Sequence, residues 1–164
     1  MDVDGVLTNG KLLYVPQPDG GIFETKTFDA CDGAAIGFLR RAGIQTGIIS
    51  GRTSPAVTRR AEELRMDYIY QGLGRTKLPA FQEILERAGL DAARICYIGD
   101  DVQDLPILTR VGFPVAVKNA RPEVLGRVAY VTNASGGDGA VREVAERILK
   151  AQGKWDATMA EFLR

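Results

Sequence analysis

Carboxylates occur at two places in the chain with a spacing suited to metal binding and proton transfer. Asp2 and Asp4 lie two residues apart and are followed by Gly5. If a strand ends here, both side chains lie on the same side, and both face the crevice beyond the carboxyl end of the strand. A DxDG tetrapeptide by itself is also typical of an Asx turn or a solvated loop.

The second acidic group follows the apolar run ICYIG and contains Asp100, Asp101 and Asp104. Three carboxylates close together repel one another unless a cation lies among them, and oxygen ligands favour Mg²⁺. Acidic turns also occur without a metal. This segment is nevertheless the strongest single motif in the chain, and it predicts a magnesium site.

Two segments between the acidic groups are suited to binding an anion. Ser50 and Gly51 follow a predicted strand and precede a helix that Ser54 caps and Pro55 opens, and a helix N-terminus with nearby hydroxyl and N–H groups attracts anions. Lys77 begins another helix, where its charge opposes the helix dipole unless an anion compensates it. An ordinary β-to-α turn and a solvated surface lysine are the alternative interpretations.

The composition excludes several kinds of chemistry and ligand. The chain has no histidine, so it has no Ser-His-Asp or Cys-His mechanism and no imidazole zinc ligand. Its 21 basic and 21 acidic residues give no net charge, which argues against nucleic-acid binding. Cys31 and Cys96 lie far apart, so the sequence indicates neither a disulfide framework nor a soft-metal site.

The sequence gives no indication of a membrane span or a secretory leader. No apolar run approaches the length of about 20 residues that a bilayer requires. Asp2 follows Met1 directly, which is unlike the start of a leader. We therefore expect a cytoplasmic protein.

Alternating strands and helices must position these groups. From residue 45 onward, short apolar runs alternate with helical patterns, which predicts an α/β fold with a doubly wound parallel sheet. Two further strands are expected at 113–117 and 129–132, with a short helix opened by Pro122 between them, for about six strands in all. Two helices show a core-facing stripe: Leu78, Phe81, Leu85 and Ala88, and Val141, Val144, Ile148 and Leu149.

Residues 10–28 have a different pattern. GKLLYV and GIFETKTF flank PQPDGG, which predicts a β-hairpin. Because an isolated hairpin is only marginally stable, we expect its apolar side chains to pack against another subunit. The chain shows no repeat or linker, and residues 1–164 are expected to form a single domain.

The order of the motifs along the chain resembles that of the haloacid dehalogenase superfamily of phosphotransferases. The finer resemblance is to the family of 3-deoxy-D-manno-octulosonate 8-phosphate (Kdo-8-phosphate) phosphatases, and it covers essentially the whole chain. The matching segments are DVDGVLTNG (2–10), FDACDGAAI (28–36), IISGR (48–52), YQG (70–72), YIGDD (97–101) and GGDGAVREV (136–144). The resemblance implies a Rossmann-like fold without a large cap domain, a homotetramer and a role in lipopolysaccharide biosynthesis.

The resemblance also implies roles for the motif residues. Asp2 would be the nucleophile that forms an aspartyl-phosphate, and Asp4 would protonate the leaving sugar alkoxide and then activate water. Asp2, Asp100 and the backbone carbonyl of Asp4 would hold Mg²⁺, which offsets the repulsion between carboxylate and phosphate. Lys77 and Ser50 would hold the phosphoryl oxygens.

The resemblance also suggests roles for the residues around this group. Asp101 and Asp104 would hold metal-bound water or orient Lys77, and they rank below Asp100. By the same resemblance Arg52, which follows Gly51, would bind the carboxylate of an acidic sugar; its alternative is a surface arginine. The turn with Arg142 would approach the active site, and residues 154–164 would close over a neighbouring subunit's site or dock on their own chain.

Two features depart from the family pattern. Asn9 stands where the family has an aspartate. Only Met1 precedes Asp2, whereas a first strand needs about five residues. We therefore expect this strand to be truncated, and we expect an added apolar strand to raise stability and activity.

Three other functions are weighed against this one. A nine-carbon sialic-type acid 9-phosphate would suit the same motifs. A receiver-like regulatory domain needs an acceptor aspartate after a middle strand, where this chain has YQG. An inactive scaffold subunit is disfavoured because every expected catalytic residue is present. The motifs do not discriminate among Mg²⁺, Mn²⁺ and Co²⁺.

Overall fold

The computed structural model describes residues 1–163, in which strands and helices alternate as predicted. In chain order the elements are β1 (Leu13–Pro16), β2 (Ile22–Thr25), α1 (Ala30–Arg41), β3 (Gly47–Ile49), α2 (Pro55–Glu63), β4 (Tyr68–Tyr70), α3 (Leu78–Ala88), β5 (Cys96–Gly99), α4 (Leu105–Leu108), β6 (Phe113–Ala116), α5 (Pro122–Leu125), β7 (Tyr130–Val131), α6 (Ala140–Ala151) and α7 (Trp155–Ala160). Short 3₁₀ helices span Ala92–Arg94, Val102–Asp104 and Glu161–Leu163.

The parallel strands form two groups with the first residues of the chain between them. β3 pairs with β4, and β5 pairs with β6, which pairs with β7. The Ile49 N–H donates to the Met1 carbonyl at 3.0 Å, and the Asp2 N–H donates to the Ile98 carbonyl at 2.9 Å. A sheet of about six strands was expected, but the five parallel strands form two separate hydrogen-bonded groups. Met1 and Asp2 lie between the groups and make too few hydrogen bonds to form a sixth strand.

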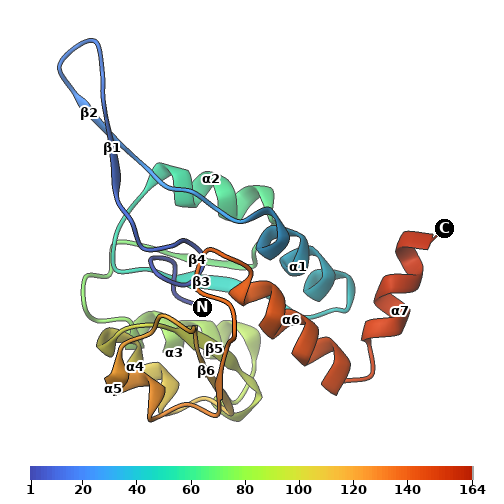
Figure 1. The fold of residues 1–164 in the computed structure, drawn as a ribbon. Coiled ribbons are helices and arrows are strands. Elements are labelled where there is room, and N and C mark those ends of the chain that lie inside the picture. Colours follow the sequence, from blue (N-terminus) through green and yellow to red (C-terminus); the bar gives the residue numbers. More distant parts are fainter. Residues whose placement is uncertain (164) are drawn as a thin grey trace.

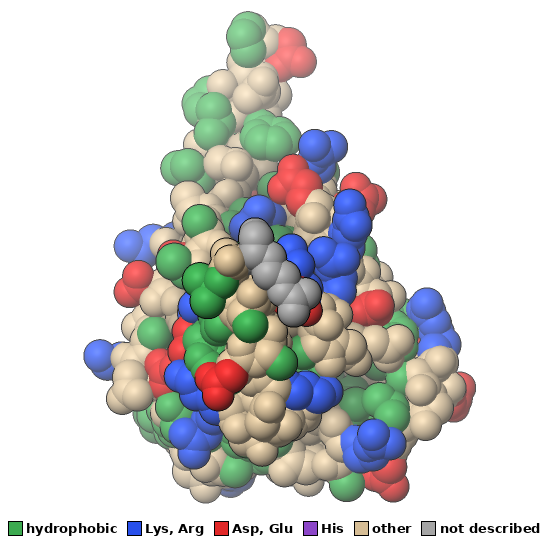
Figure 2. Space-filling model, turned by 90° about the vertical axis from the view of Figure 1, so that its right-hand side faces the viewer, with side chains coloured by type: hydrophobic (Ala, Val, Ile, Leu, Met, Phe, Trp, Pro, Cys, Tyr) green, Lys and Arg blue, Asp and Glu red, His purple; other side chains and the backbone are tan. Residues whose placement is uncertain are grey.

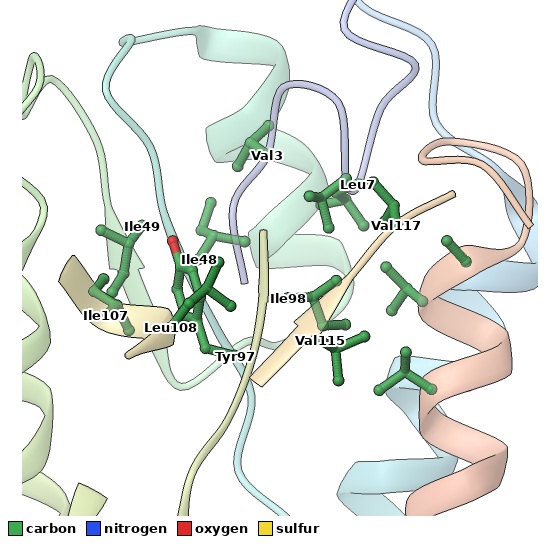
Figure 3. Close-up of a cluster of buried hydrophobic side chains, with 14 of the residues drawn as sticks. Val3, Leu7, Ile48, Ile49, Tyr97, Ile98, Ile107, Leu108, Val115 and Val117 are labelled. Carbon is green, nitrogen blue, oxygen red and sulfur yellow. The ribbon is translucent and has the colours of Figure 1, made fainter. Parts of the chain in front are cut away.

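Helices cover both sides of the strands (Figure 1). α1 packs against α6 on one side, and α3 packs against α4 on the other. The predicted stripes face the core, with Phe81, Val141, Val144 and Leu149 fully buried. Figure 3 shows part of this core, where Val3 and Leu7 of the first loop join side chains of the strands, among them Ile98 and Val115.

Several helix ends lie where the sequence predicts them. Pro55 is the first residue of α2, and Gly89 ends α3 in the left-handed conformation with a φ of 62°. Ser54 occupies the N-cap position of α2, but its side chain makes no capping hydrogen bond. Ser54 therefore has the extended backbone of an N-cap residue, but it lacks the side-chain hydrogen bond that was expected.

The predicted hairpin is confirmed as β1 and β2, which pair antiparallel. The Gln17 N–H donates to the Gly21 carbonyl at 2.8 Å and closes the turn. The hairpin projects from the body of the protein (Figure 1), and hydrophobic side chains gather along it (Figure 2). The exposed large apolar residues of the hairpin are Leu12, Leu13, Tyr14, Val15, Ile22 and Phe23.

The described residues contain neither an inserted cap domain nor a membrane-spanning helix. Among residues 1–163 the hairpin is the largest departure from the α/β body, and no cap domain is inserted. No helix in this range combines the length and the apolar character needed to cross a membrane.

Candidate active site

Three carboxylates meet at one edge of the strands. Asp2, Asp100 and Asp104 place carboxylate oxygens within 4.8 Å of one another. Asp2 follows Met1, whose carbonyl is hydrogen-bonded to β3, while the Asp2 N–H is hydrogen-bonded to β5. Asp100 and Asp104 follow β5. Asp2 and Asp104 are buried, and Asp100 is half-buried. At such distances each like-charge pair costs about 4 kcal/mol at an effective dielectric of 20, so the cluster needs positive charge.

Lys77 supplies part of this charge. Its Nζ lies 2.7 Å from Asp2 Oδ1 and 2.8 Å from Asp104 Oδ1. Burial lowers the pKa of Lys77, but the charges of Asp2 and Asp104 outweigh burial and leave the pKa raised. Lys77 is therefore a buried, charged residue that joins two acidic loops, and the alternative of a solvated surface lysine is wrong.

Asp104 is held by hydrogen-bond donors on both oxygens. Oδ1 accepts from Lys77 Nζ and from the Tyr97 hydroxyl, each at 2.8 Å. Oδ2 accepts from the N–H groups of Asp100 at 3.1 Å and Asp101 at 3.3 Å. Two roles were expected for Asp104: to hold metal-bound water or to orient Lys77. Because both of its oxygens are already hydrogen-bonded, the second role is favoured.

Asp100, in contrast to Asp104, lacks a hydrogen-bond donor on one of its carboxylate oxygens. Its Oδ1 is buried and has no hydrogen-bond partner. Burial raises the pKa of Asp100 to about 8, with further increases from the charges of Asp2 and Asp104. Burial also raises the pKa of Asp2 to about 6, and there Asp104 adds to the effect while Lys77 opposes it. A cluster of carboxylate oxygens with one unpartnered and buried fits a hard divalent cation such as Mg²⁺.

Gly5 makes the close approach of Asp100 possible. Its φ is 95°, and a Cβ at this position would lie 2.1 Å from Asp100 Oδ2. The GGDG turn packs on the same loop, since a Cβ on Gly136 would lie 1.7 Å from the Gly5 carbonyl oxygen. The Gly137 N–H also donates to the Val6 carbonyl at 2.9 Å. The two loops therefore hold each other beside the carboxylate cluster.

Asp4 lies outside the carboxylate cluster and forms an ion pair with Lys26. The sequence interpretation missed Lys26 and also the hydroxyl of Tyr97. The signal for Lys26 was its spacing from Glu24, because residues two apart at the end of a strand share a side. Tyr97 gave no separate signal, because a tyrosine inside a strand is usually a core residue.

The turn after β3 holds the next group of expected site residues. Ser50 is buried, and its Oγ accepts from the Arg52 N–H at 3.3 Å. Gly51 packs tightly, since a Cβ there would lie 2.4 Å from the Gly74 carbonyl oxygen. Arg52 is exposed and pairs with Glu24 at 2.5 Å. The turn lies at the carboxyl end of β3, on the same edge as Asp2.

Asp101 and Arg142 make contacts other than those expected. The Asp101 side chain accepts from the Val102 N–H at 2.7 Å and caps a short 3₁₀ helix. Arg142 Nε pairs with Glu146 at 2.5 Å. Its guanidinium lies 4.6 Å from the ring centroid of Phe38 and 5.9 Å from that of Trp155.

The turn that carries Arg142 lies beside the carboxylate cluster, whereas the Arg142 side chain contacts aromatic rings of the neighbouring helices. Arg142 lies in the first turn of α6, which packs on α1, and its side chain reaches Phe38 of α1 and Trp155 of α7. Phe38 also contacts Phe162, with ring centroids 5.3 Å apart. The tail consequently docks on its own chain, as one of the two expectations had it.

The chain is similar over nearly its whole length to proteins of known class. A family model described as haloacid dehalogenase-like hydrolase matches residues 71–144. The 3-deoxy-D-manno-octulosonate 8-phosphate phosphatase of Escherichia coli strain K12 is 40% identical over 163 residues, which cover 99% of this chain and 84% of that protein. The Yersinia pestis enzyme of the same name is 40% identical over 153 residues, which cover 93% and 79%. The chain belongs to the 3-deoxy-D-manno-octulosonate 8-phosphate phosphatase family of this class.

Solved structures agree with this assignment. The Moraxella catarrhalis phosphatase, solved in complex with magnesium ion, phosphate ion and KDO, has a TM-score of 0.91 and 41% identity, covering 99% of this chain and 90% of that one. The cobalt-bound Haemophilus influenzae phosphatase has a TM-score of 0.89 and 39% identity, covering 99% and 94%. The predicted doubly wound α/β fold is thereby confirmed.

Proposed function

We propose that this protein is a Mg²⁺-dependent phosphatase that hydrolyses Kdo-8-phosphate to Kdo and inorganic phosphate. The observation that carries the proposal is the position of Lys77 between Asp2 and Asp104, beside the unpartnered Oδ1 of Asp100. A nucleophilic carboxylate, a buried cation and an oxygen-only metal site are the parts that phosphoryl transfer requires. The substrate follows from the relatives named above.

Asp2 is the nucleophile in this mechanism. Its carboxylate attacks phosphorus in line, the bond from phosphorus to the sugar oxygen breaks, and an aspartyl-phosphate forms. Asp4 gives a proton to the departing alkoxide and then takes one from the water that hydrolyses the aspartyl-phosphate. Lys77 and Ser50 hold the phosphoryl oxygens during both steps.

Asp2, Asp100 and the backbone carbonyl of Asp4 would hold Mg²⁺. When bound, the ion supplies the positive charge that offsets the repulsion between the carboxylates and the phosphate. Lys77 alone cannot balance this charge, because it already compensates Asp2 and Asp104.

Arg52 selects substrates that carry a carboxylate. Its guanidinium is half exposed and pairs with the Glu24 carboxylate at 2.5 Å, and this pairing with a carboxylate supports the role. A sugar acid would replace Glu24 as its partner, and Gly51 would let the sugar approach the backbone. A neutral sugar phosphate hydrolysed equally well would contradict this role.

The protein acts as a homotetramer in the cytoplasm and contributes to lipopolysaccharide biosynthesis. Support for the assembly comes from the row of exposed apolar side chains on the hairpin, which a neighbouring subunit would cover. The likeness of the whole chain to Kdo-8-phosphate phosphatases supports the pathway.

The test is phosphate release from Kdo-8-phosphate by the wild type and by Asp2→Asn, with Mg²⁺ and with a chelator. We expect many turnovers per chain only for the wild type with Mg²⁺, and an exposed control, Asp156→Asn, should behave as the wild type does. Release that survives chelation, or an active Asp2→Asn protein, would contradict the mechanism. A single phosphate retained per chain would favour the receiver-like alternative, and a preference for a nine-carbon acid 9-phosphate would change the substrate.

A further inference from the structure

Lys26 is a buried lysine that the proposed mechanism does not use. It directly follows β2 at the base of the hairpin, and its side chain is 1% exposed. Its Nζ donates a hydrogen bond to Asp4 Oδ1. Because an ammonium group buried without a partner is strongly destabilising, the pairing with Asp4 is the reason that Lys26 can lie here.

Lys26 is part of a row of four charges that alternate in sign. Lys26 Nζ lies 3.6 Å from Glu24 Oε1, and Glu24 Oε2 binds Arg52 at 2.5 Å. The row therefore runs from Asp4, the acid and base of the mechanism, to Arg52, the residue expected to bind the substrate carboxylate. Both middle members come from the hairpin.

We propose that Lys26 positions Asp4 for proton transfer, so that the base of the hairpin contributes a positioning residue to the active site. The inference rests on the proposed phosphatase function. Lys26 occupies Oδ1 of Asp4, which leaves Oδ2 as the oxygen that carries the proton. Lys26 acts through Asp4 and touches neither the phosphate nor the metal.

The proton balance of the two steps defines what Lys26 must hold in place. In the first step the sugar oxygen leaves phosphorus with the electron pair of the broken bond and takes the proton from Asp4 Oδ2, while Asp2 bonds to phosphorus. In the second step water gives a proton to Asp4 as its oxygen attacks phosphorus, and the Asp2 carboxylate is released. A carboxylate free to rotate would be misplaced, and a misplacement of about 1 Å costs roughly 10²-fold in rate.

The dependence of rate on the leaving group separates positioning of Asp4 from a general structural role. The sugar alkoxide of Kdo-8-phosphate needs a proton to leave, whereas the nitrophenolate of p-nitrophenyl phosphate leaves without one. The quantity to compare is kcat/KM, which reports the steps up to formation of the aspartyl-phosphate. A damaged fold or a weakened metal site would lower kcat/KM for both substrates alike.

The experiment compares Lys26→Met, Lys26→Gln and the exposed hairpin control Lys11→Met with the wild type, all with Mg²⁺ and with melting temperatures recorded. For Lys26→Met we expect kcat/KM to fall by about 10²-fold on Kdo-8-phosphate and by less than about threefold on p-nitrophenyl phosphate. Lys26→Gln keeps an N–H donor, so its selective loss should be smaller. Lys11→Met should match the wild type on both substrates.

Equal losses on both substrates, no loss on either, or unfolding of both Lys26 variants would overturn the role of Lys26. Failure of the proposed function looks different. In that case the wild type itself would hydrolyse neither ester with Mg²⁺.

Discussion

The Tyr97 hydroxyl donates a hydrogen bond of 2.8 Å to Asp104 Oδ1 inside the protein core. Tyr97 is fully buried, and burial, followed by the charge of Asp104, raises its pKa well above its usual value. The hydroxyl is therefore a permanent donor. Because Lys77 binds the same oxygen of Asp104, Tyr97 helps to fix the direction from which Lys77 reaches Asp2.

Tyr97→Phe should lower both stability and activity. The change removes one hydrogen bond to a charged group and should reduce the free energy of unfolding by about 2 kcal/mol. With Asp104 less constrained, Lys77 is less well placed, and kcat should fall about tenfold. Urea denaturation and phosphate release measure the two effects. Tyr68→Phe is the matched control, because Tyr68 is also buried but donates to Gln45 away from the site. An equal loss of stability and activity in both variants would contradict the role of Tyr97.

Mg²⁺ should stabilise the folded protein through Asp100. A ligand present at about 100 times its dissociation constant adds roughly 2.7 kcal/mol to the free energy of unfolding. For a chain of this size that corresponds to a rise in Tm of about 5–10 °C. Asp100→Asn should lose most of this rise, whereas Asp101→Asn should keep it, because Asp101 caps a local turn. Differential scanning calorimetry with and without Mg²⁺ gives the comparison. A full shift retained in Asp100→Asn would place the ion elsewhere.

The sequence predicted well which groups meet at this edge of the strands, because the geometry of the edge follows from topology. Parallel strands present their carboxyl ends at one edge, so the segments that follow Met1, β4 and β5 meet there whatever the details of packing. The family resemblance placed Asp2, Lys77 and Asp100 in one site, and the structure places Lys77 against Asp2 and Asp100 beside it. The alternation of elements and the hairpin were predicted from periodicity and turn residues alone.

Contacts that depend on the tertiary arrangement could not be predicted in this way. Lys26 pairs with Asp4 because the hairpin returns to the first loop, and nothing in the local pattern fixes that return. The contacts of the Arg142 side chain depend on the packing of α7 beside α1, which presents Trp155 to it and which the sequence does not show. The short first strand, by contrast, was expected from the single residue before Asp2, and Met1 and Asp2 alone make ladder bonds between β3 and β5.

The exposed face of the hairpin should control the oligomeric state. Ile22 is 72% exposed, so an aspartate there should leave the fold of the single chain intact. In an assembly held together by apolar hairpins, however, the same change buries a charge and should shift the protein towards monomers. Sedimentation equilibrium of Ile22→Asp against the wild type measures the shift. Gln82→Asp, at an exposed position of α3, is the control. An unchanged mass for Ile22→Asp would show that the hairpin does not hold subunits together.

Asp32 joins α1 to the start of α6. It is fully buried in the first turn of α1, and its Oδ1 accepts from the Arg142 N–H at 2.8 Å, while Oδ2 has no partner. Burial raises the pKa of Asp32 from 3.8 to about 6, the neighbouring charge of Asp29 adds to this, and amide donors at the start of α6 oppose it. The folded protein therefore holds a proton on Asp32 at pH values where the unfolded chain has already lost it.

This difference gives Asp32 a pH dependence of defined sign. Between about pH 4 and pH 6 the folded state binds more protons at Asp32 than the unfolded state does, so its contribution to the free energy of unfolding falls as pH rises. Asp32→Asn keeps an oxygen for the Arg142 N–H but does not titrate. Raising the pH from about 4 to 7 should therefore favour the variant over the wild type by roughly 2 kcal/mol. Urea denaturation across this range tests the change, with exposed Asp156→Asn as the control. A difference between Asp32→Asn and the wild type that stays constant with pH would show that Asp32 is ionised throughout.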